Sequence, residues 1–156
     1  MNVIFLDIDG VLNNEKSFLR MRDDGTYYLV RDHINKDLVE LLNKLVEDTG
    51  AKIVVTSPIK HKGTNFLNRM LTNYGLTTHI YDVTPISDDK YNRGGEIKRW
   101  LSECKESIEG YVIFDDSPYL FENSDEVILN HIIFVDASTG LSEANVKQSK
   151  NGFYLK

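Results

Sequence analysis

The stretch FLDIDGVLN at residues 5–13 places two acidic side chains directly after an apolar run. The continuous run at 3–6 is typical of a strand that is buried on both faces of a sheet. Asp7 ends this strand, Asp9 follows two residues later, and Gly10 lets the chain turn away sharply. Two carboxylates this close repel each other unless a cation or a shared proton relieves the repulsion. A hard divalent ion with oxygen ligands, such as Mg²⁺, would do so, whereas the alternative interpretation is a solvated acidic turn.

Outward from this stretch, short β-prone runs alternate with longer runs that have helical spacing. The β-prone runs lie at 52–55, 76–81, 111–114 and 131–135, and the helical runs lie at 34–46, 66–71 and 97–108, with a short helix expected after Leu141. Strands that alternate with helices predict an α/β fold, with a central parallel sheet in a three-layer arrangement. In such sheets ligands bind at the carboxyl ends of the strands, so the residues there are the first candidates for a site.

The composition is that of one ordinary globular domain over residues 1–156. Hydrophobic residues make up 41% and charged residues 27% of the chain, which is enough for one core. The net charge of −6 argues against a protein that coats nucleic acid, although a local basic patch stays open. A single cysteine, Cys104, excludes an internal disulfide, and no signal-peptide pattern or membrane span is found. We therefore expect a cytoplasmic protein.

Two further strand ends carry polar side chains. Thr56 and Ser57 follow the run at 52–55, and Asp115 and Asp116 follow the run at 111–114. Alone, the first of these ends is typical of a turn, and the second of an acidic strand end. Together with the first acidic pair, they favour one site that combines carboxylates and a hydroxyl, because strand ends of a parallel sheet meet at one edge.

The segment 13–32 interrupts the alternation between the first strand and its helix. Asp23-Asp24-Gly25 is a hairpin-turn signal, and a β-prone run follows it. We interpret the segment as a small β-hairpin flap over the site, because a long loop in a compact domain is usually functional. The segment also carries basic and aromatic side chains that would suit a nucleotide or a polynucleotide end, namely Lys16, Arg20, Arg22, Tyr27, Tyr28 and Arg31. An ordinary amphipathic hairpin is the alternative.

The sequence Asp7-Ile8-Asp9-Gly10-Val11 resembles motif I of the haloacid dehalogenase (HAD) superfamily, in which a hydrophobic strand precedes Asp-x-Asp-Gly. The resemblance implies that Asp7 is a nucleophile that becomes an aspartyl-phosphate. It implies that Asp9 is the general acid and base, and that Mg²⁺ is the cofactor. The chemistry agrees with these roles, because a carboxylate nucleophile splits phosphoryl transfer into two easier steps.

The later strand ends are similar to the other motifs of this superfamily. Motif II would hydrogen-bond the transferring phosphoryl group, and motif IV would bind Mg²⁺, with Asp116 as the preferred direct ligand. The cation of motif III is open among Lys98, Arg93 and Lys90, with Lys98 slightly favoured. The resemblance thus implies the phosphate-binding residues Gly10, Thr56, Ser57, Arg93 and Lys98. It also implies the metal ligands Asp7, Asp9, Asp115 and Asp116, with Asp9 acting through its backbone carbonyl.

The chain has no obvious room for a large cap domain, so it resembles the small capless HAD phosphatases. Its acidic pattern is similar to that of the phosphatase domain of polynucleotide kinase-phosphatases. We expect a Mg²⁺-dependent phosphomonoesterase that acts on nucleotides or nucleic-acid ends and has no membrane partner, and the oligomeric state is left open. The alternative is a receiver-like phosphoacceptor domain without turnover. Receivers place an acid pair after the first strand and their phosphoacceptor after the third. Here an Asp-x-Asp follows the first strand and another acid pair comes late in the chain, which favours the enzyme.

Overall fold

A computed structural model describes residues 1–14, 19–29, 33–89 and 91–153, and at positions 19, 20, 28 and 29 it describes the backbone alone. Three of the candidate cations, Lys16, Arg31 and Lys90, lie outside this part, as do the side chains of Arg20 and Tyr28.

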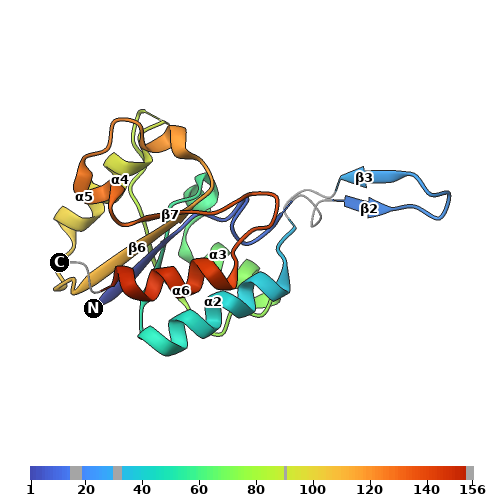
Figure 1. Ribbon diagram of the computed structural model, residues 1–156, viewed down its shortest axis with the longest axis horizontal. Coiled ribbons are helices and arrows are strands. Elements are labelled where there is room, and N and C mark those ends of the chain that lie inside the picture. The colour runs from blue at the N-terminus through green and yellow to red at the C-terminus, as the bar shows by residue number, and fades with distance from the viewer. Residues whose placement is uncertain (15–18, 30–32, 90, 154–156) are drawn as a thin grey trace.

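Five parallel strands form the central sheet in the order β5-β4-β1-β6-β7 (Figure 1). Their bounds are Asn2–Leu6 for β1, Lys52–Val55 for β4, Ile80–Val83 for β5, Gly110–Asp115 for β6 and Ile132–Phe134 for β7. The apolar run at 3–6 lies in the middle strand and is fully buried. The expected parallel sheet is therefore confirmed.

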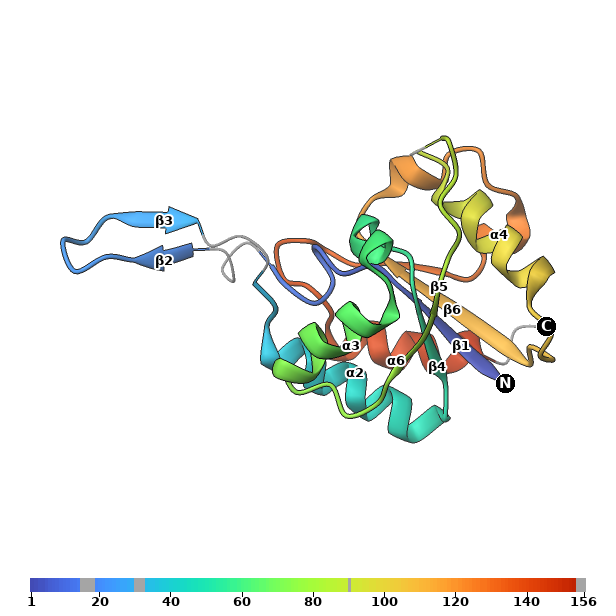
Figure 2. The ribbon, with the colours of Figure 1, turned by 180° about the vertical axis from the view of Figure 1, so that it is seen from behind.

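Helices cover both faces of the sheet, which gives the expected three layers (Figures 1 and 2). On one face lie α2 (Lys36–Thr49), α3 (Thr64–Asn73) and α6 (Glu143–Gly152), and on the other lie α4 (Arg93–Glu103) and the short α5 (Glu126–Leu129). Each face has its own hydrophobic core. Leu42, Leu67 and Val146 belong to the first core, and Ile97 and Ile128 belong to the second.

The register of the strands brings three polar strand ends to one edge. Leu6 pairs with Val55 of β4 and with Phe114 of β6. The next residue of each strand continues the pairing, because the Asp7 amide donates to the Phe114 carbonyl at 3.0 Å and the Thr56 amide donates to the Leu6 carbonyl at 2.9 Å. Thr56, Asp7 and Asp115 therefore lie next to one another, in this order, at the carboxyl edge of β4, β1 and β6, as the sequence predicts.

Short helical turns leave the sheet at this edge. The 3₁₀ turns η1 (Pro58–Lys62) and η2 (Pro118–Phe121) follow β4 and β6, and each has a proline in its first turn, where a missing amide donor does no harm. Helix α4 begins with Arg93 because Asn92 caps it, and the Asn92 side chain accepts from the Gly95 amide at 2.9 Å. The cap fixes the position of Arg93 relative to the strand ends.

The segment between β1 and α2 forms the expected hairpin, with β2 (Leu19–Met21) antiparallel to β3 (Tyr27–Leu29). Its turn is closed by Asp24, whose carboxylate accepts from the amide and the hydroxyl of Thr26 at 2.9 and 2.6 Å. The hairpin extends away from the body of the domain in both views (Figures 1 and 2), so that closure over the site stays a prediction. No helix in the described ranges combines the length and the apolar character that crossing a bilayer requires.

Candidate active site

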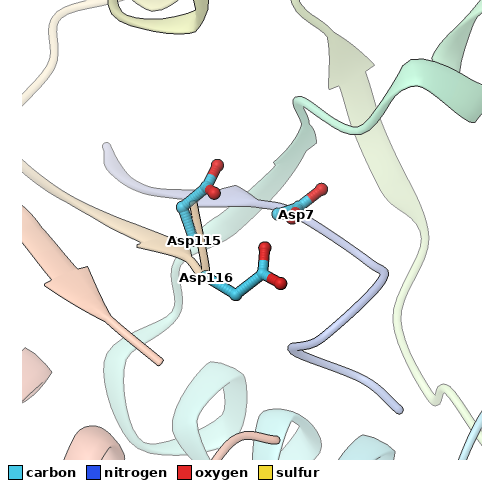
Figure 3. Close-up of side chains that lie close together, drawn as sticks. All are labelled: Asp7, Asp115 and Asp116. Atoms are coloured by element: carbon cyan, nitrogen blue, oxygen red, sulfur yellow. The ribbon is translucent and has the colours of Figure 1, made fainter. Parts of the chain in front are cut away.

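Three carboxylates meet at the carboxyl edge of β1 and β6. Asp7, Asp115 and Asp116 each offer one oxygen, and these oxygens lie within 4.8 Å of one another (Figure 3). Asp115 is fully buried and Asp7 is 4% exposed. The two acidic pairs that the sequence singled out are thus brought together by the pairing of neighbouring strands, and three of their four members form one cluster.

Burial makes the ionised form of this cluster unfavourable without a compensating positive charge. Burial raises the pKa of the Asp7 carboxyl well above its ordinary value, and the charge of Asp115 raises it further, while Arg93 acts in the opposite direction. Burial also raises the pKa of Asp115, again against the effect of Arg93. A cation is therefore what the cluster needs in order to hold its carboxylates ionised.

Part of that positive charge comes from Arg93. Its Nη1 lies 2.6 Å from Oδ2 of Asp115 and 3.2 Å from Oδ1 of Asp7. Burial acts to lower the pKa of Arg93, but Asp7 and Asp115 raise it above the ordinary value, so the guanidinium stays charged. One arginine bridges a strand end of β1 and one of β6, and it orients both carboxylates.

The structure places Lys98, the candidate that the sequence slightly favours for this cation, away from the three-carboxylate cluster. The Lys98 side chain is 68% exposed, and its ammonium pairs with Asp125 at 2.5 Å, across to α5. Lys98 lies five residues after Arg93, which turns it by about 140° around the axis of α4. Lys98 therefore faces solvent, whereas Arg93 faces the strand ends. Lys90, the third option, lies outside the described residues.

Asp9 lies beside the cluster but not in it. Its side chain is exposed, and its Oδ1 accepts from Nδ2 of Asn13 at 3.0 Å. Asn13 is fully buried, and it also accepts from the Gly10 amide at 2.7 Å and donates to the His33 carbonyl at 3.0 Å. Asn13 thus fixes both the turn and the carboxylate of Asp9. The sequence analysis gave Asn13 no role, although it stands next to motif I.

The two residues with hydroxyl side chains that follow β4, Thr56 and Ser57, are both buried. The Thr56 hydroxyl has no hydrogen-bond partner among the described residues. An unpaired buried hydroxyl is unfavourable, so its place at the strand edge suits an incoming oxygen acceptor such as a phosphoryl group. Ser57 is also buried, and its carbonyl accepts from the Lys60 amide at 2.9 Å to begin η1.

Gly10 is required where the chain passes the cluster. Its φ of 80° lies in the left-handed region, and a Cβ built on it would lie 2.2 Å from Oδ2 of Asp116. Any other residue would push the Asp116 carboxylate aside. The phosphate-binding role expected for Gly10 stays a prediction, and what the geometry gives is close packing against a candidate metal ligand.

A buried ion pair that the sequence analysis missed links η1 to α4. Lys60 is 5% exposed, and its ammonium donates to Thr84 at 3.0 Å and forms an ion pair with Glu96. Glu96 also accepts from the Ser87 amide at 2.9 Å. Burial lowers the pKa of Lys60, while the hydrogen bond that Lys60 donates to Glu96 opposes that effect. Since Glu96 lies one turn after Arg93, this network ties the arginine's helix to the end of β4.

The donor set of the cluster suits a hard divalent cation. All three carboxylates offer oxygen, no sulfur or imidazole ligand is among them, and two of them come from consecutive residues of one rigid strand end. Oxygen-only sites of this kind favour Mg²⁺ over zinc or copper.

The chain matches the model of a known protein family. A model of the family described as "HAD domain in Swiss Army Knife RNA repair proteins" matches residues 3–146, which run from β1 into α6. No protein of curated function matches the chain at a significant level.

Proposed function

The chain belongs to the family of HAD domains in Swiss Army Knife RNA repair proteins, which implies a phosphatase-type function, and from this premise we propose a Mg²⁺-dependent phosphomonoesterase with Asp7 as its nucleophile. The observation that carries the proposal is the convergence of Asp7, Asp115 and Asp116 with Arg93 at one sheet edge. The unpartnered Thr56 hydroxyl at the same edge supports it. A cytoplasmic location stays a prediction.

Two successive transfers at phosphorus account for turnover. In the first, an oxygen of Asp7 bonds to phosphorus, the bond from phosphorus to the ester oxygen breaks, and Asp9 gives its proton to the leaving oxygen. In the second, Asp9 takes a proton from water, the water oxygen bonds to phosphorus, and the acyl phosphate bond to Asp7 breaks. Inorganic phosphate leaves, and both aspartates return to their starting forms.

The other residues hold and orient. Arg93 keeps Asp7 ionised and fixes its direction, and Thr56 donates its hydroxyl hydrogen to a phosphoryl oxygen. Asn13 donates a hydrogen bond from its side-chain amide to the Asp9 carboxylate and so orients the proposed acid and base. When it is bound, Mg²⁺ would be held by Asp7, Asp115 and Asp116 and would offset the charge repulsion between the nucleophile and the phosphate.

For the substrate we propose a phosphorylated nucleic-acid end or a nucleotide. The family's description places such domains in RNA repair proteins. Between Asp9 and α2 the described residues form only the hairpin, and between Ser57 and α4 they form only η1, α3 and β5. A site without a cap domain in these places is accessible to the end of a large molecule. The acidic net charge of −6 agrees with recognition of an end rather than of a long stretch of backbone.

Hydrolysis of an aryl phosphate by wild type and by Asp7→Asn, with Mg²⁺ or with EDTA, tests the proposal. We expect turnover by wild type in Mg²⁺, no turnover in EDTA, and a loss of at least about 10³-fold in kcat for Asp7→Asn, which keeps the shape of the side chain but is not a nucleophile. Asp48→Asn is the matched control, because Asp48 is an exposed aspartate whose partner is Lys150.

Three results would contradict the proposal. Full activity of Asp7→Asn would exclude the aspartyl-phosphate. Undiminished turnover in EDTA would exclude the metal. Uptake of one phosphoryl group from a reactive donor without turnover would favour the receiver-like alternative instead.

A further inference from the structure

A pocket of about 350 Å³ opens beside Asp9, and the three carboxylates of the cluster are not among its lining residues. Its walls are mainly apolar and come from the first turn after β1, from η1 and from α3. Ile59, Phe66 and Met70 pack against the core with part of their surface and leave the rest facing this pocket. A space of this volume with mostly apolar walls is typical of a small-molecule site.

The position of Asp9 places the pocket on the leaving-group side of the reaction. In the proposed function Asp9 gives its proton to the ester oxygen, so the group that carries this oxygen lies within hydrogen-bond reach of the Asp9 carboxylate. Asp9 is also part of the pocket lining. The group released from phosphorus is therefore the part of the substrate that has direct access to this space.

The lining favours a flat, weakly polar group there. Phe66 offers an aromatic ring, and the Lys62 ammonium lies 4.7 Å from the centre of that ring. A nucleobase would gain stacking and apolar burial against Ile59, Phe66 and Met70. A glycerol or a sugar would have to leave water for walls that offer few hydrogen bonds.

Two basic residues, Lys62 and His61, contribute to the lining of the same pocket. Lys62 and His61 are both exposed, and the His61 ring is held by its Nδ1 at 2.8 Å from the Pro58 carbonyl. A second phosphate, on the far side of the nucleoside in the pocket, would be attracted to them. A polynucleotide offers such a phosphate one nucleotide away from its end.

We propose that this pocket binds the base of the terminal nucleotide whose phosphate is removed, with Phe66 as the stacking residue and Lys62 and His61 facing the next phosphate. The inference rests on the proposed function and goes further, because it names the residues that select the leaving group. It predicts discrimination by the group attached to the ester oxygen rather than by the phosphate itself.

The test compares kcat/KM for a nucleoside monophosphate with kcat/KM for glycerol phosphate in each variant. Phe66→Leu keeps an apolar side chain against the core but removes the ring. We expect it to lower the ratio of the two kcat/KM values about tenfold, which corresponds to about 1.4 kcal/mol. Lys62→Gln should lower kcat/KM for a dinucleotide that carries the second phosphate, with a smaller effect on the mononucleotide. Tyr81→Ala removes an aromatic side chain exposed on β5. It should change neither the ratio of the two kcat/KM values nor the kcat/KM for the dinucleotide.

A binding measurement separates this inference from the proposed function. An unphosphorylated nucleoside is titrated into wild type and Phe66→Leu by ligand-detected NMR, without any turnover. Saturable binding that weakens in Phe66→Leu supports the pocket, even if no phosphatase activity is found. Absence of binding, or an unchanged kcat/KM ratio in a folded Phe66→Leu, overturns it, even if the Asp7→Asn result upholds the phosphatase.

Discussion

The Arg93 guanidinium offsets the charge repulsion between two of the three carboxylates of the cluster. The carboxylates of Asp7 and Asp115 are buried side by side, and a single guanidinium contacts both. Removing that guanidinium leaves two buried acids that share no positive charge, so they would protonate or move apart. In the mechanism proposed above a protonated Asp7 would be a poor nucleophile, so that mechanism requires the arginine even if the guanidinium never touches the substrate.

We expect Arg93→Gln to lower kcat for an aryl phosphate by about 10²- to 10³-fold, the effect typical of a lost electrostatic contact at the reacting group. Circular dichroism checks that the variant is folded. Arg93→Lys keeps the charge but not the two-carboxylate geometry, and it should recover only part of the loss.

Lys98→Gln is the matched control for the arginine. Because Lys98 faces solvent and pairs with Asp125, its loss should leave kcat unchanged. The hydrogen bond from Lys98 lowers the pKa of Asp125, so NMR titration should show that pKa rising toward its ordinary value in the variant. A carboxyl whose pKa is lowered on folding stabilises the folded protein at pH values above its unfolded-state pKa, and this stabilisation is lost as the pH falls through its folded-state pKa. The free energy of unfolding of the variant should therefore fall less on acidification than that of wild type. Loss of activity in Lys98→Gln would show that Lys98 acts in the candidate active site.

Gly10→Ala is expected to weaken Mg²⁺ binding at least about tenfold, because its Cβ would lie 2.2 Å from Oδ2 of Asp116. Gly25→Ala separates this clash from backbone strain. Gly25 has a similar φ of 84°, but a Cβ there meets no atom within 4 Å. Both variants should be destabilised by about 1 kcal/mol, and calorimetric titration with Mg²⁺ should distinguish them. Equal Mg²⁺ affinities would show that Asp116 is not a metal ligand.

At the level of elements, most of the fold follows from apolar pattern and cap residues. The middle strands and α2 are close to their expected ranges because long apolar runs and the Asn35 cap leave few alternatives. The apolar stripe begins only at Ile97, whereas α4 begins at Arg93, because Gly94 and Gly95 have no side chains that would mark the first turn. The stripe alone therefore does not show that Arg93 faces the strand ends while Lys98 faces solvent.

Other errors concern features that local patterns do not encode. The strand expected at 76–81 is β5 at Ile80–Val83, because Leu76 packs in the core before the strand begins. The partners of Lys60 lie on β5's end and on α4, far along the chain. A lysine after Thr-Ser-Pro gives no sign of burial until those elements are assembled.

The buried ion pair of Lys60 on η1 with Glu96 on α4 should be costly to break, because removing one partner leaves the other charge buried. We expect Lys60→Ala to lower the free energy of unfolding by about 3–5 kcal/mol, because Glu96 would stay buried without its cation. Urea denaturation measures this change. Lys60→Met combined with Glu96→Gln removes both charges and should recover much of the loss, whereas a double variant as unstable as Lys60→Ala would show that packing, not charge, dominates.

At the level of the whole molecule, the site depends on the sheet, so a ligand of the site should stabilise the entire domain. We expect Mg²⁺ to raise the Tm, by an amount that corresponds to about 2.7 kcal/mol when its concentration is a hundred times the Kd. EDTA should reverse the shift. Asp116→Asn should abolish it, and Asp48→Asn should not, because Asp48 lies at the end of α2. A shift of equal size in Asp116→Asn would place the ion elsewhere.

The position of β1 between β4 and β6 also sets when the site comes into existence. On a ribosome, β1 and β4 emerge long before β6, and a domain generally folds as a unit. A nascent chain that ends before β6 has Asp7 but neither of its two carboxylate neighbours, and β1 lacks its pairing on one side. The long-range closure of β6 onto β1 is a slow kind of step, because distant parts of the chain must meet. The three-carboxylate cluster is therefore assembled only in chains in which β6 has paired with β1.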